Sequence, residues 1–93
     1  MTEGVLRKEM MIINRRGLHA RASAKFVQLV GEYDANVTVE KDGVSVGGTS
    51  IMGLMMLAAS PGCGITVSAQ GPQAAEVMEA LEKLIGDRFG EEC

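Results

Sequence analysis

The spacing of apolar residues changes near residue 17, and this change limits the possible folds more than any other feature of the chain. Residues 6–13 alternate between two faces, one of them mostly apolar, which predicts a strand. From Ala20 the apolar residues follow one stripe of a helix, formed by Ala22, Phe26, Leu29 and Val30. Gly31 is suited to end that helix. The chain therefore begins with a strand, a sharp corner and a helix.

The middle of the chain predicts a hairpin followed by a short helix. Valines alternate with polar residues over 37–39 and 44–46, and Asp42-Gly43 between them is a typical hairpin turn. The loop 47–50 ends at Ser50, whose hydroxyl can cap a helix that we expect over 51–59. Leu54 and Leu57 share the inward face of that helix.

The last third predicts one more strand and one more helix. Residues 65–69 alternate as a strand does, and Pro72 suits the first turn of a helix, where its missing N–H is not needed. The buried stripe of this helix is formed by Ala74, Val77, Met78, Leu81, Leu84 and Ile85. Gly86 and Gly90 loosen its end.

The element order is thus β-α-β-β-α-β-α, which indicates an α+β fold. Strands that alternate in polarity have one packed face and one wet face, so we expect three helices to cover one face of a four-stranded antiparallel sheet. The length of 93 residues predicts one domain over 1–93, with a folded core over 5–90 and short tails. A domain of this size has its sites on the rim, because it holds only one small core.

Composition argues against several classes of function. The net charge of −3 and the small number of aromatic residues disfavour a nucleic-acid partner. No apolar run is long enough to span a membrane, and residues 1–11 lack the apolar core of a signal peptide, so we expect a cytoplasmic protein. Cys63 and Cys93 form no C-x-x-C pair, and a single histidine cannot complete a usual zinc set. We expect free thiols, no metal and no cofactor.

The single histidine, His19, stands at the corner between the first strand and the first helix. Imidazole is nucleophilic near neutral pH, and a helix start offers unpaired N–H groups that favour an anion. Arg21 can add a forked contact to phosphate oxygens. A lone histidine is often an ordinary surface or core residue, but this context favours a group that carries phosphate.

Two segments resemble the signatures of a known family. Residues 13–21, Ile-Asn-Arg-Arg-Gly-Leu-His-Ala-Arg, resemble the active-site signature of HPr, the histidine-containing phosphocarrier of the bacterial phosphotransferase system. Residues 49–54, Thr-Ser-Ile-Met-Gly-Leu, resemble the family's second signature, around a regulatory serine. The resemblance implies the HPr-like open-faced sandwich and a carrier that takes phosphate from enzyme I and passes it to an enzyme IIA.

The resemblance also implies roles for individual residues. His19 would be phosphorylated, on Nδ1 as in the family, and Arg21 would contact phosphate and partner enzymes. The backbone N–H groups of Ala20 and Arg21 would hold the phosphate. Ser50 would be the target of an HPr kinase/phosphorylase, and it caps a helix whatever its further role. The docking patch beside the histidine would consist of Ile51, Met52 and Met55, on a carrier that acts as a monomer without membrane insertion.

Two points remain open at this level. The family usually has proline after the arginine, where this chain has Ala22, so the helix start is either looser or richer by one N–H donor. Residues 69–73 and 89–92 resemble the nitrogen-related branch of the family, which is tied to regulation more than to sugar uptake. The alternative function is a regulatory or binding module on the same scaffold that relays no phosphate, which should tolerate loss of His19.

Overall fold

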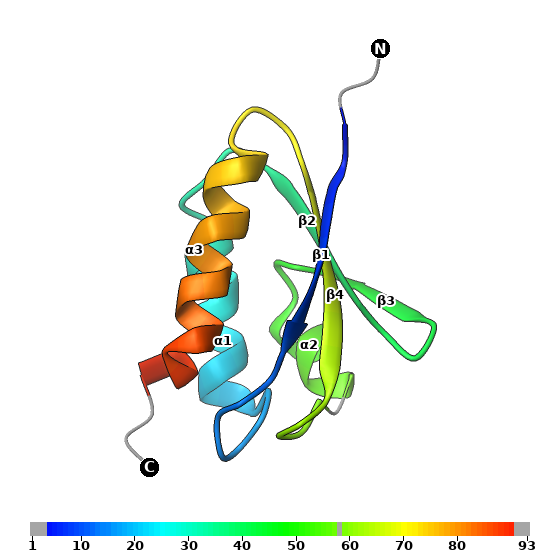
Figure 1. The fold of residues 1–93 in the computed structure, drawn as a ribbon, viewed down its shortest axis with the longest axis vertical. Coiled ribbons are helices and arrows are strands. Elements are labelled where there is room, and N and C mark those ends of the chain that lie inside the picture. The colour runs from blue at the N-terminus through cyan, green and yellow to red at the C-terminus, as the bar shows by residue number, and fades with distance from the viewer. Residues whose placement is uncertain (1–3, 58, 91–93) are drawn as a thin grey trace.

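A computed structural model describes residues 4–57 and 59–90 of the chain, and Cys93 lies outside them. The elements follow the predicted order, with one extra turn at the end (Figure 1). The strands are β1 (Leu6–Met11), β2 (Asn36–Lys41), β3 (Val44–Gly47) and β4 (Gly64–Gln70). The helices are α1 (Ala20–Val30), α2 (Ile51–Met56) and α3 (Ala74–Gly86), followed by the 3-10 turn η1 (Arg88–Gly90).

The four strands form one antiparallel sheet, as predicted, and their order in the sheet is β1-β4-β2-β3. The central strand β4 pairs with β1 on one side and with β2 on the other, so that Val67 lies opposite both Lys8 and Val39. Figure 1 shows the helices on one side of this sheet. The fold is therefore the α+β open-faced sandwich that the sequence indicates.

The core lies between the sheet and the helices. Phe26 of α1, Leu54 of α2 and Leu81 of α3 are fully buried against Val39 and Val67 of the sheet. The predicted inward face of the second helix is confirmed, since both Leu54 and Leu57 are buried. Burying these side chains is the main force that holds the helices on the sheet.

The hairpin turn is confirmed in detail. Asp42 and Gly43 both have positive φ angles, 51° and 83°, as a type I′ turn requires. The second helix is shorter than the predicted 51–59: α2 ends at Met56 and Leu57 caps it. Ala59 lies beyond the helix, and its carbonyl accepts a hydrogen bond from Leu18 N–H at 2.9 Å.

The prediction that Pro72 lies in the first turn of the last helix is wrong. Gly71, with a φ of 125°, and Pro72 instead form a turn that the Ala74 N–H closes onto the Gly71 carbonyl at 3.1 Å. The helix starts only at Ala74. The side chain of Gln73 accepts a hydrogen bond from Asp34 N–H, which ties this turn to the loop after α1.

The segment after α3 adds a residue to the core that the predicted helix stripes do not include. After α3 the turn η1 places the Phe89 ring in the core, where it is 2% exposed. The Phe89 carbonyl accepts a hydrogen bond from the Lys25 ammonium at 2.7 Å, so the last turn is joined to α1. In the described part of the chain, no helix has the length and apolar character needed to cross a membrane.

Candidate functional site

The corner before α1 is built around Gly17. Its φ of 65° lies in the left-handed region, and a Cβ at this position would stand 2.2 Å from the Ala59 carbonyl oxygen. Only glycine fits both the conformation and the close approach. The same carbonyl accepts the Leu18 N–H, so the segment before β4 supports the corner directly.

Short hydrogen bonds fix the remainder of the corner. The buried Asn14 donates from Nδ2 to the Gly17 carbonyl at 2.9 Å, and His19 N–H donates to the same carbonyl at 2.9 Å. The Ser23 hydroxyl, also buried, donates to the Leu18 carbonyl at 3.2 Å. These bonds bracket His19 on both sides. The side chains of Asn14 and Ser23 thus hold the start of the helix. Ala22, at the position where the family resemblance predicts proline, is buried.

His19 is the N-cap of α1. Its backbone is extended, and its Nδ1 accepts the Arg21 N–H at 3.3 Å. An accepting nitrogen must carry a lone pair, so a ring that makes this hydrogen bond presents an unprotonated Nδ1 to the start of α1. The Arg21 N–H belongs to the first turn of α1. This turn comes before the first intrahelical bond, from Ser23 N–H to the His19 carbonyl.

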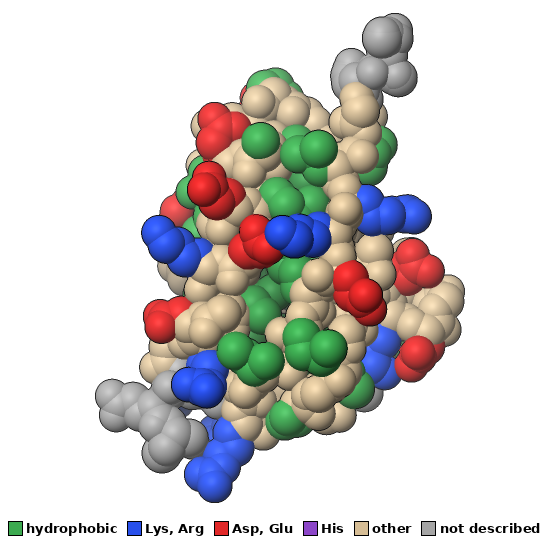
Figure 2. Space-filling view, viewed as in Figure 1, with side chains coloured by type: hydrophobic (Ala, Val, Ile, Leu, Met, Phe, Trp, Pro, Cys, Tyr) green, Lys and Arg blue, Asp and Glu red, His purple; other side chains and the backbone are tan. Residues whose placement is uncertain are grey.

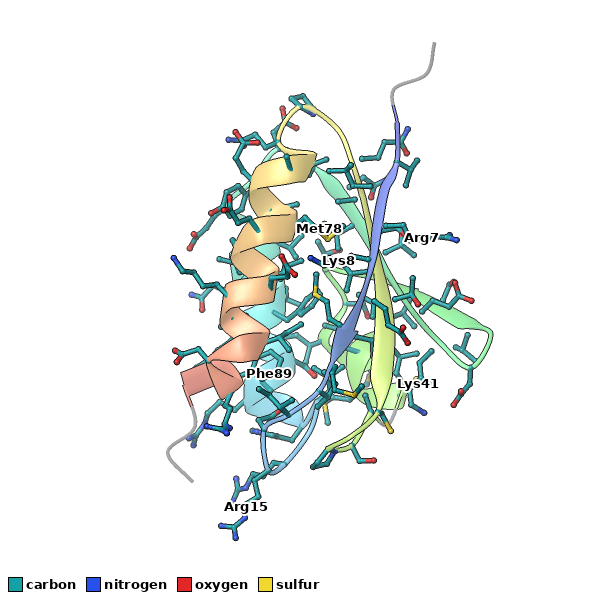
Figure 3. All side chains as sticks on the ribbon, in the orientation of Figure 1. Arg7, Lys8, Arg15, Lys41, Met78 and Phe89 are labelled. Atoms are coloured by element: carbon teal, nitrogen blue, oxygen red, sulfur yellow. The ribbon has the colours of Figure 1, made fainter. Side chains whose placement is uncertain are left out.

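The surroundings of His19 are cationic in sequence and in space. No carboxylate occurs between Glu9 and Glu32, whereas this interval contains Arg15, Arg16, Arg21 and Lys25. Figure 3 shows Arg15 at the lower tip of the molecule, pointing outward from the loop before α1. On the face drawn in Figure 2, the lowest part of the molecule carries blue side chains and no red ones. The corner therefore favours an anion.

Ser50 is the N-cap of α2, as predicted. Its Oγ accepts the Gly53 N–H at 2.9 Å. Gly53 makes room for this bond, because a Cβ there would stand 2.9 Å from Ser50 Oγ and 3.0 Å from the Val46 Cβ. The serine is exposed, so its hydroxyl is reachable from solvent while it caps the helix.

The outer face of α2 is an apolar patch, here called the methionine patch, which consists of Ile51, Met52, Met55 and Met56. Met52 is 70% exposed and Met56 is 77% exposed, although both are large apolar side chains. The docking patch predicted from the sequence contains Ile51, Met52 and Met55 but lacks Met56, the most exposed of the four. The sequence does contain a signal for the exposure of Met56, because Met56 stands between Met55 of the predicted patch and the inward Leu57.

The fold brings the two signature segments together. Helices α1 and α2 pack side by side, with the start of α1 and all of α2 at the same end of the molecule (Figure 1). His19 and Arg21 therefore share one end of the protein with Ser50 and the methionine patch. This end combines a nucleophilic nitrogen at a helix start, cations and an exposed apolar surface.

Cys63, in the segment before β4, lies at the edge of this region. Its sulfur is 3.5 Å from the Ser60 hydroxyl, and hydrogen bonding from Ser60 lowers the pKa of the thiol below its ordinary value. The Cys63 carbonyl also accepts the Ile12 N–H. Among the described residues, no group of three or more possible ligands could hold a metal ion.

Comparison with known proteins identifies the family in which this site occurs. Residues 6–87 match the family model "PTS HPr component phosphorylation site". The phosphocarrier protein HPr of Cupriavidus necator is 48% identical over 87 residues, which cover 94% of this chain and 98% of the relative. The chain belongs to the HPr family. Its function is that of an HPr phosphocarrier in the phosphotransferase system, and a carrier of this kind is not itself a catalyst.

Solved HPr structures agree with the fold. An HPr from Thermoanaerobacter tengcongensis superposes with a TM-score of 0.89 and 41% identity, covering 95% of this chain and 99% of that one. The HPr from Bacillus anthracis gives 0.85 and 37%, covering 89% and 99%. The HPr-like sandwich is therefore shared over nearly the whole chain.

Proposed function

We propose that His19 is the residue that carries the phosphoryl group, and that Nδ1 is the bonding atom. The observation that supports this most is the orientation of Nδ1 toward the Arg21 N–H at the start of α1. A phosphoryl group on Nδ1 would take the place of the nitrogen lone pair. It would lie at the positive end of the helix dipole, among the N–H groups of the first turn.

The transfer can proceed with few protein groups. The Nδ1 lone pair attacks the phosphorus of the phosphorylated donor, and the bond between phosphorus and the donor breaks. The Arg21 N–H then donates its hydrogen bond to a phosphate oxygen, since the ring nitrogen can no longer accept it. Ala20 N–H lies in the same turn and can bind a second oxygen. The exposed Arg21 side chain adds a charge-assisted hydrogen bond. Solvent screens these charges, so the phosphate remains transferable.

The partners follow from the family. Enzyme I, charged from phosphoenolpyruvate, would donate the phosphoryl group, and an enzyme IIA would accept it. The methionine patch is the docking surface that we propose for both, because it lies at the same end as His19 and is apolar and exposed. Thioether side chains are flexible and suit a surface that binds more than one partner. Whether the acceptor serves sugar uptake or nitrogen regulation depends on which enzyme IIA the patch fits.

Ser50 is the regulatory site that we propose. A phosphate on its hydroxyl would lie at the start of α2, next to Ile51 and Met52. The helix start would tolerate this charge, so the fold would persist. The phosphate would instead lower the affinity of a partner for the patch. On docking, the phosphate would either lose its hydrating water or lie close to negative charge on the partner. An HPr kinase/phosphorylase would be the enzyme that adds it.

Intact-mass spectrometry at neutral pH tests the central proposal. The protein and His19→Ala are incubated with phosphoenolpyruvate and an enzyme I that is proven active on another HPr. The proposal predicts one added phosphoryl group on the wild type, lost on brief acid treatment because phosphohistidine is acid-labile, and none on His19→Ala. Equal phosphorylation of both proteins, or of neither, contradicts it. No phosphorylation of either would favour the binding module that relays no phosphate.

A further inference from the structure

The methionines in the described part of the chain fall into two groups that differ in access to solvent. Met10 and Met78 are buried, at 5% and 7% exposed. Met52 and Met56 on α2 are more than two thirds exposed, and Met55 beside them is 43% exposed. Three of the seven methionines are thus concentrated in one six-residue helix, on the side that faces away from the core.

We propose that the methionine patch is a reversible oxidation site, through which peroxide slows phosphoryl transfer. In the reaction, a thioether sulfur attacks one oxygen of hydrogen peroxide, the O–O bond breaks, an S–O bond forms and water leaves. The sulfur is oxidised by two electrons and the peroxide is reduced. Methionine sulfoxide reductases reverse the change, so the modification can act as a switch.

The physical effect depends on what oxidation does to an apolar docking surface. The inference rests on the proposed function, in which the patch becomes buried against enzyme I or enzyme IIA. A sulfoxide oxygen is a strong acceptor, and burying it without a donor costs free energy, while the apolar area that drove docking is reduced. The core residues of this segment are Leu54 and Leu57, which lie outside the patch, so oxidation should leave the fold intact.

The location of the patch separates this effect from damage to the transfer chemistry. His19 and its hydrogen bonds involve residues 14–23 and Ala59, none of which is a methionine. Oxidation of α2 therefore changes docking and leaves the nucleophile as it was. We expect a higher KM for the carrier in the enzyme I reaction, with a smaller change in kcat.

Two internal controls are available in the chain. Met11 on β1 is 52% exposed but lies outside α2, so it reports what oxidation of an exposed methionine does away from the patch. Cys63 has a lowered thiol pKa and competes for peroxide. Dithiothreitol reverses the sulfenic acid and disulfide forms of a thiol but leaves methionine sulfoxide, whereas the reductases act on the sulfoxide alone.

The experiment treats the whole protein with increasing hydrogen peroxide, then with dithiothreitol. Peptide mass mapping records the oxidised residues, and enzyme I kinetics are measured before and after treatment with both methionine sulfoxide reductases. Unmodified protein is assayed first, so a failure of phosphorylation itself is seen separately from a failure of the oxidation effect. The variants are Met52→Leu/Met55→Leu/Met56→Leu, which keeps the patch apolar, and Met11→Leu.

We expect Met52 and Met56 to oxidise before Met10 and Met78, with kcat/KM for the carrier lowered by roughly ten- to hundredfold and restored by the reductases. The triple leucine variant is compared with its own untreated rate, which peroxide should leave unchanged, whereas Met11→Leu should lose activity on peroxide treatment as the wild type does. The proposal is overturned if patch oxidation leaves kcat/KM unchanged, if the triple variant is as sensitive as the wild type, or if dithiothreitol alone restores transfer.

Discussion

Two helices of this protein begin at residues whose side chains accept a backbone N–H, and their chemistry differs. At the start of α1 the acceptor is His19 Nδ1, bound to the N–H two residues on at 3.3 Å. At the start of α2 it is Ser50 Oγ, bound to the N–H three residues on at 2.9 Å. Both side chains therefore lie where a helix start favours a bound phosphate.

The difference lies in what each acceptor can do without help. Imidazole is a nucleophile at neutral pH and holds a phosphoryl group reversibly, whereas a serine hydroxyl needs a base to activate it. The described structure gives His19 a corner fixed by buried polar groups, and it gives Ser50 an exposed apolar helix. The same helix position would thus suit the carrier residue that we propose in one place and the regulatory residue that we propose in the other, where an external kinase would have to supply the base.

Breaking the corner should have the largest effect. Gly17→Ala places a Cβ against the Ala59 carbonyl in a left-handed conformation. We expect a loss on the order of 3 kcal/mol in the free energy of unfolding, measured by urea denaturation. The matched control is Gly43→Ala, which has a φ of 83° but open space around it, and it should lose only about 1 kcal/mol. Equal losses in the two variants would mean that the close approach of Gly17 to the Ala59 carbonyl adds nothing to the cost of the substitution.

Removing the charge at the first helix start should slow transfer. Arg21→Ala deletes an exposed guanidinium, so the free energy of unfolding should change by less than about 0.5 kcal/mol. The rate of phosphorylation by enzyme I should fall by roughly ten- to hundredfold, because a charge-assisted hydrogen bond to phosphate is lost. Arg7→Ala on β1 removes a guanidinium outside the site and should leave this rate unchanged. An equal fall in both variants would indicate an effect of net charge alone.

At the second helix start, capping and docking can be separated. Ser50→Ala loses the bond to Gly53 N–H and should cost about 1 kcal/mol of stability in urea denaturation. Enzyme I should phosphorylate it at close to the wild-type rate.

Ser50→Asp keeps a capping oxygen and should be nearly as stable as the wild type, because aspartate caps helices well and suits the dipole. Its negative charge beside the methionine patch should lower the affinity for enzyme I, as measured by titration calorimetry. Wild-type affinity in Ser50→Asp would contradict the regulatory proposal.

The smallest effect is expected at Ala22. Its N–H belongs to the first turn, where no carbonyl one turn earlier can accept it, so Ala22→Pro should change the free energy of unfolding by less than about 1 kcal/mol. Phosphorylation by enzyme I should persist. A marked fall in its rate would show that this N–H is one of the donors that hold the phosphate.

The sequence predicts the fold well because local and global signals agree. The alternation over 6–13, the Asp42-Gly43 turn and the stripes of the first and last helices each specify one element, and the structure contains all of them. The predictions are wrong where contacts between distant segments determine the local structure. Pro72 stands before α3 because Gly71 turns the chain there, and Phe89 becomes core through a turn that contacts α1.

The candidate site shows the same division. His19 and Ser50 can be selected from sequence because their position at a helix start is a local property. The close approach of Gly17 to Ala59 cannot, since it joins residues 42 positions apart in the chain. The exposure of Met56 depends on where α2 meets the sheet and α1, which residue spacing in a six-residue helix does not determine.

The most direct test of the central claim is to identify the nitrogen that bonds to phosphorus. Protein with ¹⁵N in the imidazole and backbone is phosphorylated by enzyme I and phosphoenolpyruvate, and NMR spectra record the ¹⁵N–³¹P coupling of the ring. We expect coupling at Nδ1 of His19, together with amide shifts at Ala20 and Arg21 as their N–H groups bind phosphate. Coupling at Nε2, or a phosphoryl group on another residue, would contradict this claim.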